Sequence, residues 1–290
     1  MKYRGLEIVA FIFMVLTLSS CSEIKIIENE QSLIVQEAKI EDLSNVEKIE
    51  IDTSITDVNL ERVDSEFVEV KLETYDSGPK LSVSEGKVLR INAERESEGL
   101  IINVGFTRSP KLKISVPKTY NKSYDIELST GDFNAEDIIA DSFKSHSSTG
   151  DIYISKLEAN NTEFISSTGD IAVDNLSSEN ISVDSSTGDV DFKNVEGNII
   201  GESSTGDVTI EYVKFDYDLD YTVSTSDLKI KLNNDEADFN IDAEASVGDV
   251  QFDRILSEVF EKKDDEVKGI VGEGKNKLKL ESSVGDIIIE

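Results

Sequence analysis

Aspartate recurs at one position of a repeated polar motif, Ser-x-Gly-Asp or a close variant, whose longest copies read Ser-Ser-Thr-Gly-Asp. If the copies stack, their carboxylates form a column along one edge of the protein. Carboxylate oxygens in such a column can bind Ca²⁺, or they can accept the hydrogen bonds that hold tight turns closed. The members of this aspartate column are Asp132, Asp151, Asp170, Asp189, Asp207, Asp227, Asp249 and Asp286.

The column needs a partner for each carboxylate, because two like charges about 4 Å apart repel by about 1 kcal/mol even in water. Hydrogen-bond donors within each turn are one kind of partner, and a row of Ca²⁺ ions bound along the column is another. The motif lacks the extra glycines of known calcium-binding solenoid repeats. We therefore favour the turn interpretation, in which no cofactor is required, and keep Ca²⁺ as the alternative.

The spacing of the motif indicates the elements that position these aspartates. Its copies start at Ser129, Ser148, Ser167, Ser186, Ser204, Ser224, Ser246 and Ser283, in steps of 19, 19, 19, 18, 20, 22 and 37 residues. An apolar-x-apolar pair follows each aspartate, and a second hydrophobic position mostly precedes each later motif by five residues, so each period holds two short strands. The repeat predicts an all-β, parallel β-helix-like β-solenoid of about 19-residue coils, with the glycine turn as a corner.

The regular repeat occupies residues 119–290, with an irregular insertion near 254–268 that we expect to include a helical turn. Residues 46–118 also alternate, and we interpret them as irregular N-terminal β coils that merge into the stack. Within them, the segment Ser54–Val58 resembles a degenerate corner without its glycine. The three prolines all precede the repeat, as uninterrupted strand ladders require.

The start of the chain predicts export and lipid anchoring. Lys2 and Arg4 precede an apolar run over Ile8–Leu18, which is too short to span a bilayer as a helix. The following Leu-Ser-Ser-Cys ending resembles a bacterial lipobox, so residues 1–20 are expected to be a lipoprotein signal peptide, Cys21 the lipidated residue, and 21–45 a tether. A plain cleaved signal and an uncleaved anchor are the alternatives. The expected location is extracytoplasmic, at the bacterial cell membrane.

The charge of the chain restricts its partners. There are 60 Asp and Glu residues against 29 Lys and Arg residues, a net charge of −31, which argues against nucleic acid because like charges repel. One stretch, from Gly99 to Ser123, contains no acid. Its cations either balance the acidic coils or form a docking patch for wall polymer, lipid head groups or a protein partner. They are Arg108, Lys111, Lys113, Lys118 and Lys122.

Over about residues 46–290 the sequence resembles the "putative-adhesin", β-strand-repeat family of unknown function found in bacterial envelope proteins. The matching features are the serial S-T-G-D-[IV] corners, the strand "KISVPK" at Lys113–Lys118 and the ending "GIVGEGKNKLKLESSVGDIIIE". The resemblance implies envelope association, with adhesion or envelope-stress signalling as roles, and it brings no catalytic motif.

Three functions follow as hypotheses. The first is a non-catalytic, lipid-anchored envelope protein whose acidic β-solenoid surface serves adhesion, binding or scaffolding. The second is a regulatory lipoprotein that contacts a membrane sensor protein in envelope-stress signalling. The third, an enzyme acting on wall polysaccharide, is disfavoured: its acid and base should interrupt the repeat locally, whereas the same corner is copied throughout.

Overall fold

The computed structural model describes residues 25–27, 33–95, 101–103, 109–233 and 237–290. The chain divides into two units, one of residues 1–32 and 96–108, the other of residues 33–95 and 109–290. In the first unit, β1 (Lys25–Ile27) pairs in parallel with β8 (Ile101–Asn103). Everything below concerns the second unit. Among the described residues, no helix has the length and hydropathy needed to cross a membrane.

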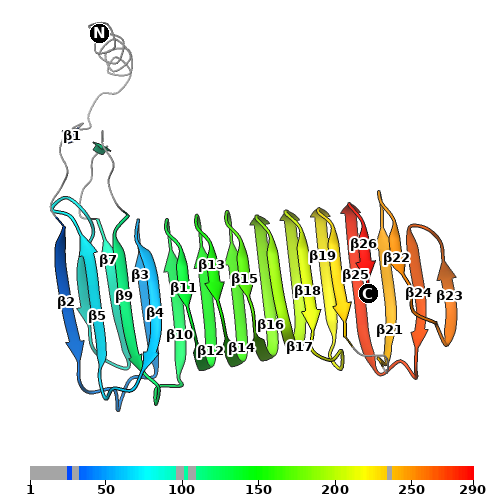
Figure 1. The fold of residues 1–290 in the computed structure, drawn as a ribbon, viewed down its shortest axis with the longest axis horizontal. Coiled ribbons are helices and arrows are strands. Elements are labelled where there is room, and N and C mark those ends of the chain that lie inside the picture. The colour runs from blue at the N-terminus through cyan, green and yellow to red at the C-terminus, as the bar shows by residue number, and fades with distance from the viewer. Residues whose placement is uncertain (1–24, 28–32, 96–100, 104–108, 234–236) are drawn as a thin grey trace, which may run out of the picture. The chain divides into compact units, whose positions relative to one another are not determined.

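The second unit is a β-solenoid of 24 strands, which confirms the predicted fold class (Figure 1). Its strands line two faces, and each corner motif joins a strand of the second face to one of the first. The first face runs, in spatial order, through β2 (Ile34–Ile40), β5 (Val68–Thr74), β9 (Lys111–Pro117), β4 (Asp57–Val63), β11 (Phe133–Ala135), β13 (Ile152–Ile154), β15 (Ile171–Val173), β17 (Val190–Thr205), β18 (Val208–Tyr212), β20 (Leu228–Leu232), β26 (Ile287–Ile289) and β22 (Val250–Phe252).

The second face shares the long strand β17, whose later half turns onto it. Its spatial order is β6 (Lys80–Ser84), β7 (Val88–Glu94), β3 (Lys48–Thr53), β10 (Ser123–Leu128), β12 (Ile138–Ser147), β14 (Leu157–Ser166), β16 (Leu176–Thr187), β17, β19 (Leu219–Thr225), β25 (Asn276–Val284), β21 (Phe239–Ala245), β24 (Glu266–Val271) and β23 (Glu258–Lys262).

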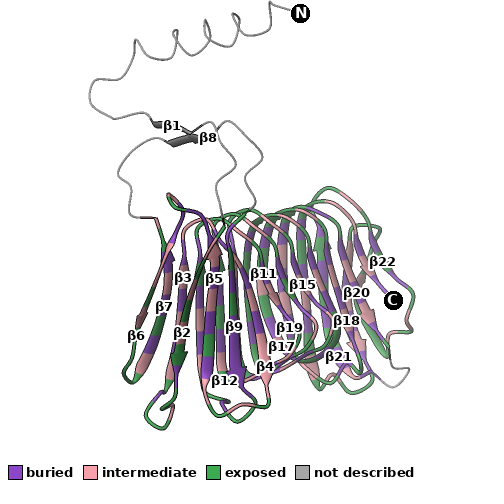
Figure 2. Ribbon diagram, turned by 60° about the vertical axis from the view of Figure 1, so that its left-hand side comes forward, coloured by how far each residue is buried: buried purple, intermediate pink, exposed green. Residues whose placement is uncertain are grey.

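The core lies between the faces and consists of the columns that the sequence period predicts. Phe133 is in register with Ile152, and Ile152 with Ile171, along the first face, and all three side chains are buried. On the second face Phe143 is in register with Thr162. Burial therefore alternates along most strands of the stack, as Figure 2 shows, because successive side chains of a strand point to opposite sides.

The coil order at the C-terminal end differs from the sequence order. The coil of β25 and β26 lies between that of β19 and β20 and that of β21 and β22 (Figure 1). After β22 the chain leaves the stack for a hairpin and returns on the inner side of β21. A coil with the common corner can pair with either neighbour, so the 37-residue step does not reveal which side it takes.

Two local expectations are wrong. Residues 34–40 of the predicted tether form β2, which pairs with β5 at the edge of the first face. The insertion near 254–268 contains the antiparallel strands β23 and β24 instead of a helical turn. Within 46–118 the predicted N-terminal coils are present: β3 and β4 form one coil of the parallel stack, and β7 and β9 pair with them in parallel as another. The additional strands β5 and β6 pair with β9 and β7 in antiparallel fashion. A short turn joins β6 to β7, and a short turn can only reverse the chain, while parallel pairing needs a full coil as a crossover.

Candidate functional site

The corners stack through their glycines. Gly169 has a φ of +132°, and a Cβ placed on it would lie 2.2 Å from the carbonyl oxygen of Gly150 in the preceding coil. The position therefore needs glycine twice, for its left-handed backbone and for the close approach of the next corner. Gly131, Gly150, Gly188, Gly206, Gly248 and Gly285 have the same kind of geometry.

The structure brings all eight predicted aspartates into one column. The Oδ1 atom of each accepts a hydrogen bond from the backbone amide of the aspartate in the next coil, except Asp249, the last. The spatial order ends Asp227, Asp286, Asp249, since the amide of Asp286 bonds to Asp227 at 2.8 Å and that of Asp249 to Asp286 at 2.9 Å. The turn interpretation placed these hydrogen bonds within each turn, whereas the structure shows that they run between coils.

The column has a ninth member that the sequence reasoning missed. The amide of Asp132 donates to Oδ1 of Asp57 at 3.3 Å, and Thr56 stands where later corners carry glycine. The sequence signal for this ninth member is the degenerate corner Ser54–Val58, because Asp57 occupies the aspartate position of that corner. Among the described residues, no three His, Cys, Asp or Glu side chains are grouped to hold a metal ion.

The predicted docking patch is distributed among ion pairs. The distance from the lysine Nζ to the nearest carboxylate oxygen is 2.9 Å for Lys113 and Glu61, 3.2 Å for Lys118 and Asp64, and 3.6 Å for Lys122 and Asp141. Burial alone would raise the pKa of Glu61, but hydrogen bonds from Ser115 and Lys113 outweigh it and lower that pKa below its ordinary value. Lys111 is exposed near the start of β9.

Three predicted features lie outside the described residues: Arg108, Cys21 with its signal peptide, and residues 22–24 and 28–32 of the tether.

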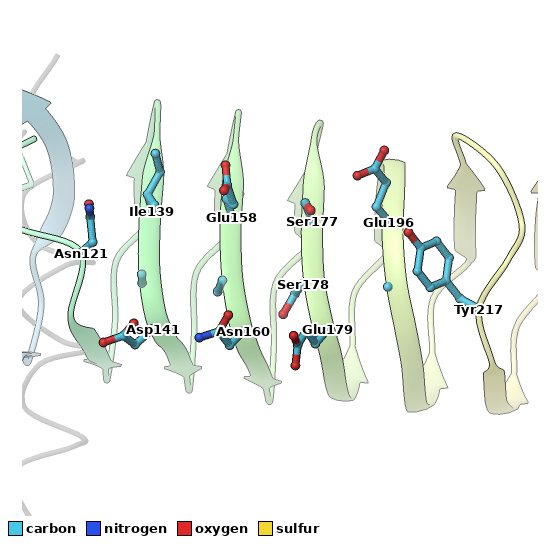
Figure 3. Close-up of a pocket in the computed structure, with 13 residues that line it drawn as sticks. Asn121, Ile139, Asp141, Glu158, Asn160, Ser177, Ser178, Glu179, Glu196 and Tyr217 are labelled. Atoms are coloured by element: carbon cyan, nitrogen blue, oxygen red, sulfur yellow. The ribbon is translucent and has the colours of Figure 1, made fainter.

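A groove that sequence reasoning missed crosses four coils of the second face (Figure 3). It has a volume of about 410 Å³, and its floor is a column of small residues, Ala140, Ala159, Ser178 and Gly197. Carboxylates flank this floor from Asp141, Glu158, Glu179 and Glu196, and we call it the acidic groove. The only sequence signal was the small residue two positions after a buried aliphatic in each coil.

Tyr217 closes one end of the acidic groove (Figure 3). Partial burial, followed by the negative charges of Glu196 and Asp216, raises the pKa of its phenol. At the other end, the amide oxygen of Asn121 accepts a 2.6 Å hydrogen bond from the guanidinium of Arg62. That guanidinium is almost fully buried and also pairs with Asp137 at 3.0 Å. Both ends of the groove are thus held by buried or half-buried side chains.

Solved structures of similar fold come from bacteria. A "putative adhesin" from Bacteroides fragilis NCTC 9343 is 15% identical with a TM-score of 0.60, over 91% of this chain and all of that one. A "putative lipid binding protein" from Parabacteroides distasonis ATCC 8503 is 13% identical with a TM-score of 0.47, over 92% of this chain and all of that one. No curated protein matches. The family model described as Toastrack DUF4097 matches residues 46–290, and the chain belongs to that family.

Proposed function

We propose that the protein is a lipid-anchored, non-catalytic, extracytoplasmic protein that presents a rigid acidic surface for adhesion, binding or scaffolding at the bacterial envelope. The observation that carries the proposal is the continuity of the aspartate column. Nine corners, from Asp57 to Asp249, form one hydrogen-bonded series along the stack. A surface that repeats in this way is suited to contact with an extended partner.

The same continuity argues against catalysis. Acid–base enzymes place two titratable groups in different environments, so that one holds a proton while the other does not. The corner aspartates have instead nearly the same surroundings: seven of the nine follow a glycine, and eight accept a backbone amide on Oδ1. In the double variant Asp170→Asn/Asp189→Asn, any rate of wall-glycan hydrolysis measured with the purified protein should equal the wild-type rate.

The partner's contacting surface is expected to be positively charged. The carboxylates of the column and of the acidic groove contribute to the chain's net charge of −31. This charge repels anionic polymers and speeds the encounter with cationic segments. The ion pairs of Lys113, Lys118 and Lys122 leave little free positive charge for docking on an anionic partner.

In-cell photocrosslinking tests the proposed function. A photoreactive residue replaces Thr168 at a corner, Asn160 in the acidic groove, or Lys118 in the basic stretch, and Ile200, exposed on the second face, is the control position. We expect capture from Thr168 and Asn160 and little from Ile200, with capture reduced by raised salt. Capture of one membrane protein from Lys118 alone would favour the regulatory hypothesis and overturn this one.

The anchor is tested separately by metabolic labelling with an alkynyl fatty acid. Label should enter the wild-type chain and not the Cys21→Ser variant, and only the wild type should partition into detergent. Equal labelling of both chains would refute lipidation at Cys21.

A further inference from the structure

A second groove lies on the first face, across β9, β4, β11 and β13, and shares no lining residue with the acidic groove. It is open to solvent and has a volume of about 510 Å³. We call it the tyrosine groove. The polar and aromatic side chains that line it are Asn59, Glu61, Lys113, Asn134, Glu136, Tyr153 and Ser155.

Tyr153 offers a fixed aromatic surface at one end of this groove. Its hydroxyl donates a 2.7 Å hydrogen bond to Oδ2 of Asp174 and accepts one of 3.3 Å from Ser155. In the next coil its register partner is the small Ala172, which leaves room for the ring to lean toward Asp174. The side chain remains 41% exposed. Among the residues of described burial, only Phe260 is another exposed aromatic.

Two unpaired side-chain amides line the same groove, one in the strand next to Tyr153 and one in the strand beyond it. Asn59 and Asn134 are register partners on β4 and β11, and Asn134 is in turn the register partner of Tyr153. Elsewhere in the stack, asparagines in adjacent coils bond to each other, as Asn194 does to Asn175 and Asn180 to Asn161, both at 3.2 Å. Within the described part of the chain, neither Asn59 nor Asn134 has a side-chain hydrogen bond, so their donors and acceptors are available to a ligand.

This combination matches the chemistry of a sugar chain. A pyranose ring has a C–H face that packs on an aromatic ring and a rim of hydroxyls that pair with amide groups. The four strands cover about 14 Å at the usual strand spacing, the length of a short oligosaccharide. Lys113 and Glu61 neutralise each other at 2.9 Å, and Glu136 adds negative charge, which disfavours an acidic polymer.

We infer that the tyrosine groove binds neutral oligosaccharides. Tyr153 stacks on one sugar, and Asn59 and Asn134 hydrogen-bond the hydroxyls or acetamido groups of the units beside it. The inference goes beyond the proposed function by giving the protein a second binding surface with its own ligand class. It rests on that function only in placing the protein where glycans are present.

Saturation-transfer NMR on the full chain in detergent tests the inference. The probes are cellotetraose, maltotetraose and tetra-N-acetylchitotetraose, with a tetragalacturonate as the acidic comparison. At least one neutral probe should receive saturation and the acidic one should not. Tyr153→Ala, and separately the double variant Asn59→Ala/Asn134→Ala, should weaken binding at least tenfold. Tyr153→Phe, which keeps the ring without its hydroxyl anchor, should fall between, and Ile200→Ala should bind as the wild type does.

Absence of transfer to all three neutral probes would overturn the inference, as would binding that persists in both the Tyr153→Ala and the Asn59→Ala/Asn134→Ala chains, or equal binding of the acidic probe. Photocrosslinking from Thr168 and Asn160 reports on different surfaces, so the proposed function can hold while the tyrosine groove fails, and the reverse. Native far-ultraviolet circular dichroism of each variant shows that loss of binding does not come from unfolding.

Discussion

The backbone amide of Asp170 donates a 2.9 Å hydrogen bond to Oδ1 of Asp151, the residue at the same corner position one coil earlier. Each corner aspartate between the first and the last therefore uses its carboxylate for the next coil, and its own amide donates to the carboxylate of the coil before it. A charged acceptor makes a stronger hydrogen bond than a neutral one. This offsets the repulsion between stacked carboxylates and explains why aspartate is copied from coil to coil.

Replacement of Asp170 by Ala should reduce the free energy of unfolding by about 1 kcal/mol, because the amide of Asp189 loses its 2.8 Å partner. Asp170→Asn keeps an acceptor oxygen and should cost less. The matched control is Asp184→Ala, which removes an exposed carboxylate with no hydrogen bond among the described residues. Urea unfolding measures all three, and equal effects of Asp170→Ala and Asp184→Ala would show that only charge matters.

Gly169→Ala should destabilise the protein by about 2 kcal/mol or more. The added methyl group must occupy a left-handed backbone position and would meet the Gly150 carbonyl oxygen at 2.2 Å. Gly86→Ala is the control, because its nearest atom would lie 3.7 Å away in ordinary contact and its φ is not in the left-handed region. A Gly169→Ala melting temperature equal to that of Gly86→Ala would contradict the stacked-corner geometry.

Engineered disulfides can test the order of the last coils, since Cys21 is the only native cysteine. In a Cys21→Ser background, cysteines at Thr225 and Val284, which are register partners, should form a disulfide on mild oxidation. Cysteines at Thr225 and Val247 should not, because two coil spacings, about 10 Å, exceed the Cα separation of about 7 Å that a disulfide tolerates. Mobility on a non-reducing gel distinguishes them, and the opposite pattern would restore sequential coil order.

Acid should weaken the turn held by Asp238. Its Oδ1 accepts hydrogen bonds from the backbone amides of Lys275 and Glu273, each with an N···O distance of 2.9 Å. These bonds lower the pKa of the Asp238 carboxyl below its ordinary value of 3.8. A lowered folded-state pKa contributes stability that is present above the unfolded pKa and lost as pH falls through the folded value. Asp238→Asn should therefore be less stable than wild type at pH 7, and the difference should shrink below about pH 4. Asp253→Asn is the control, and a difference independent of pH would contradict the assignment.

The corners and core columns could be predicted from sequence because each depends on contacts repeated at a fixed interval. The Gly-Asp pair, as at Gly150 and Asp151, recurs together in most corners. The 19-residue interval alone therefore predicts that Ile152 lies next to Phe133 in the adjacent coil. The position of Asp286 could not be predicted, since identical corners accept a neighbour on either side. The two grooves could not be predicted either: small residues such as Gly197 form no motif, and the hydroxyl of Tyr153 reaches Asp174 only after the coils stack.

Calcium titration tests the central claim, which is that the aspartates of the column hydrogen-bond between coils and form an acidic surface, and that they do not bind a row of cations. Isothermal titration calorimetry in 0.15 M salt would compare Ca²⁺ with Mg²⁺ on the wild-type and Asp170→Asn chains. We predict no stoichiometric binding, and equal, small effects of both ions that reflect screening alone. Saturable binding of Ca²⁺ but not of Mg²⁺, reduced in Asp170→Asn, would contradict the account and make the column a metal site.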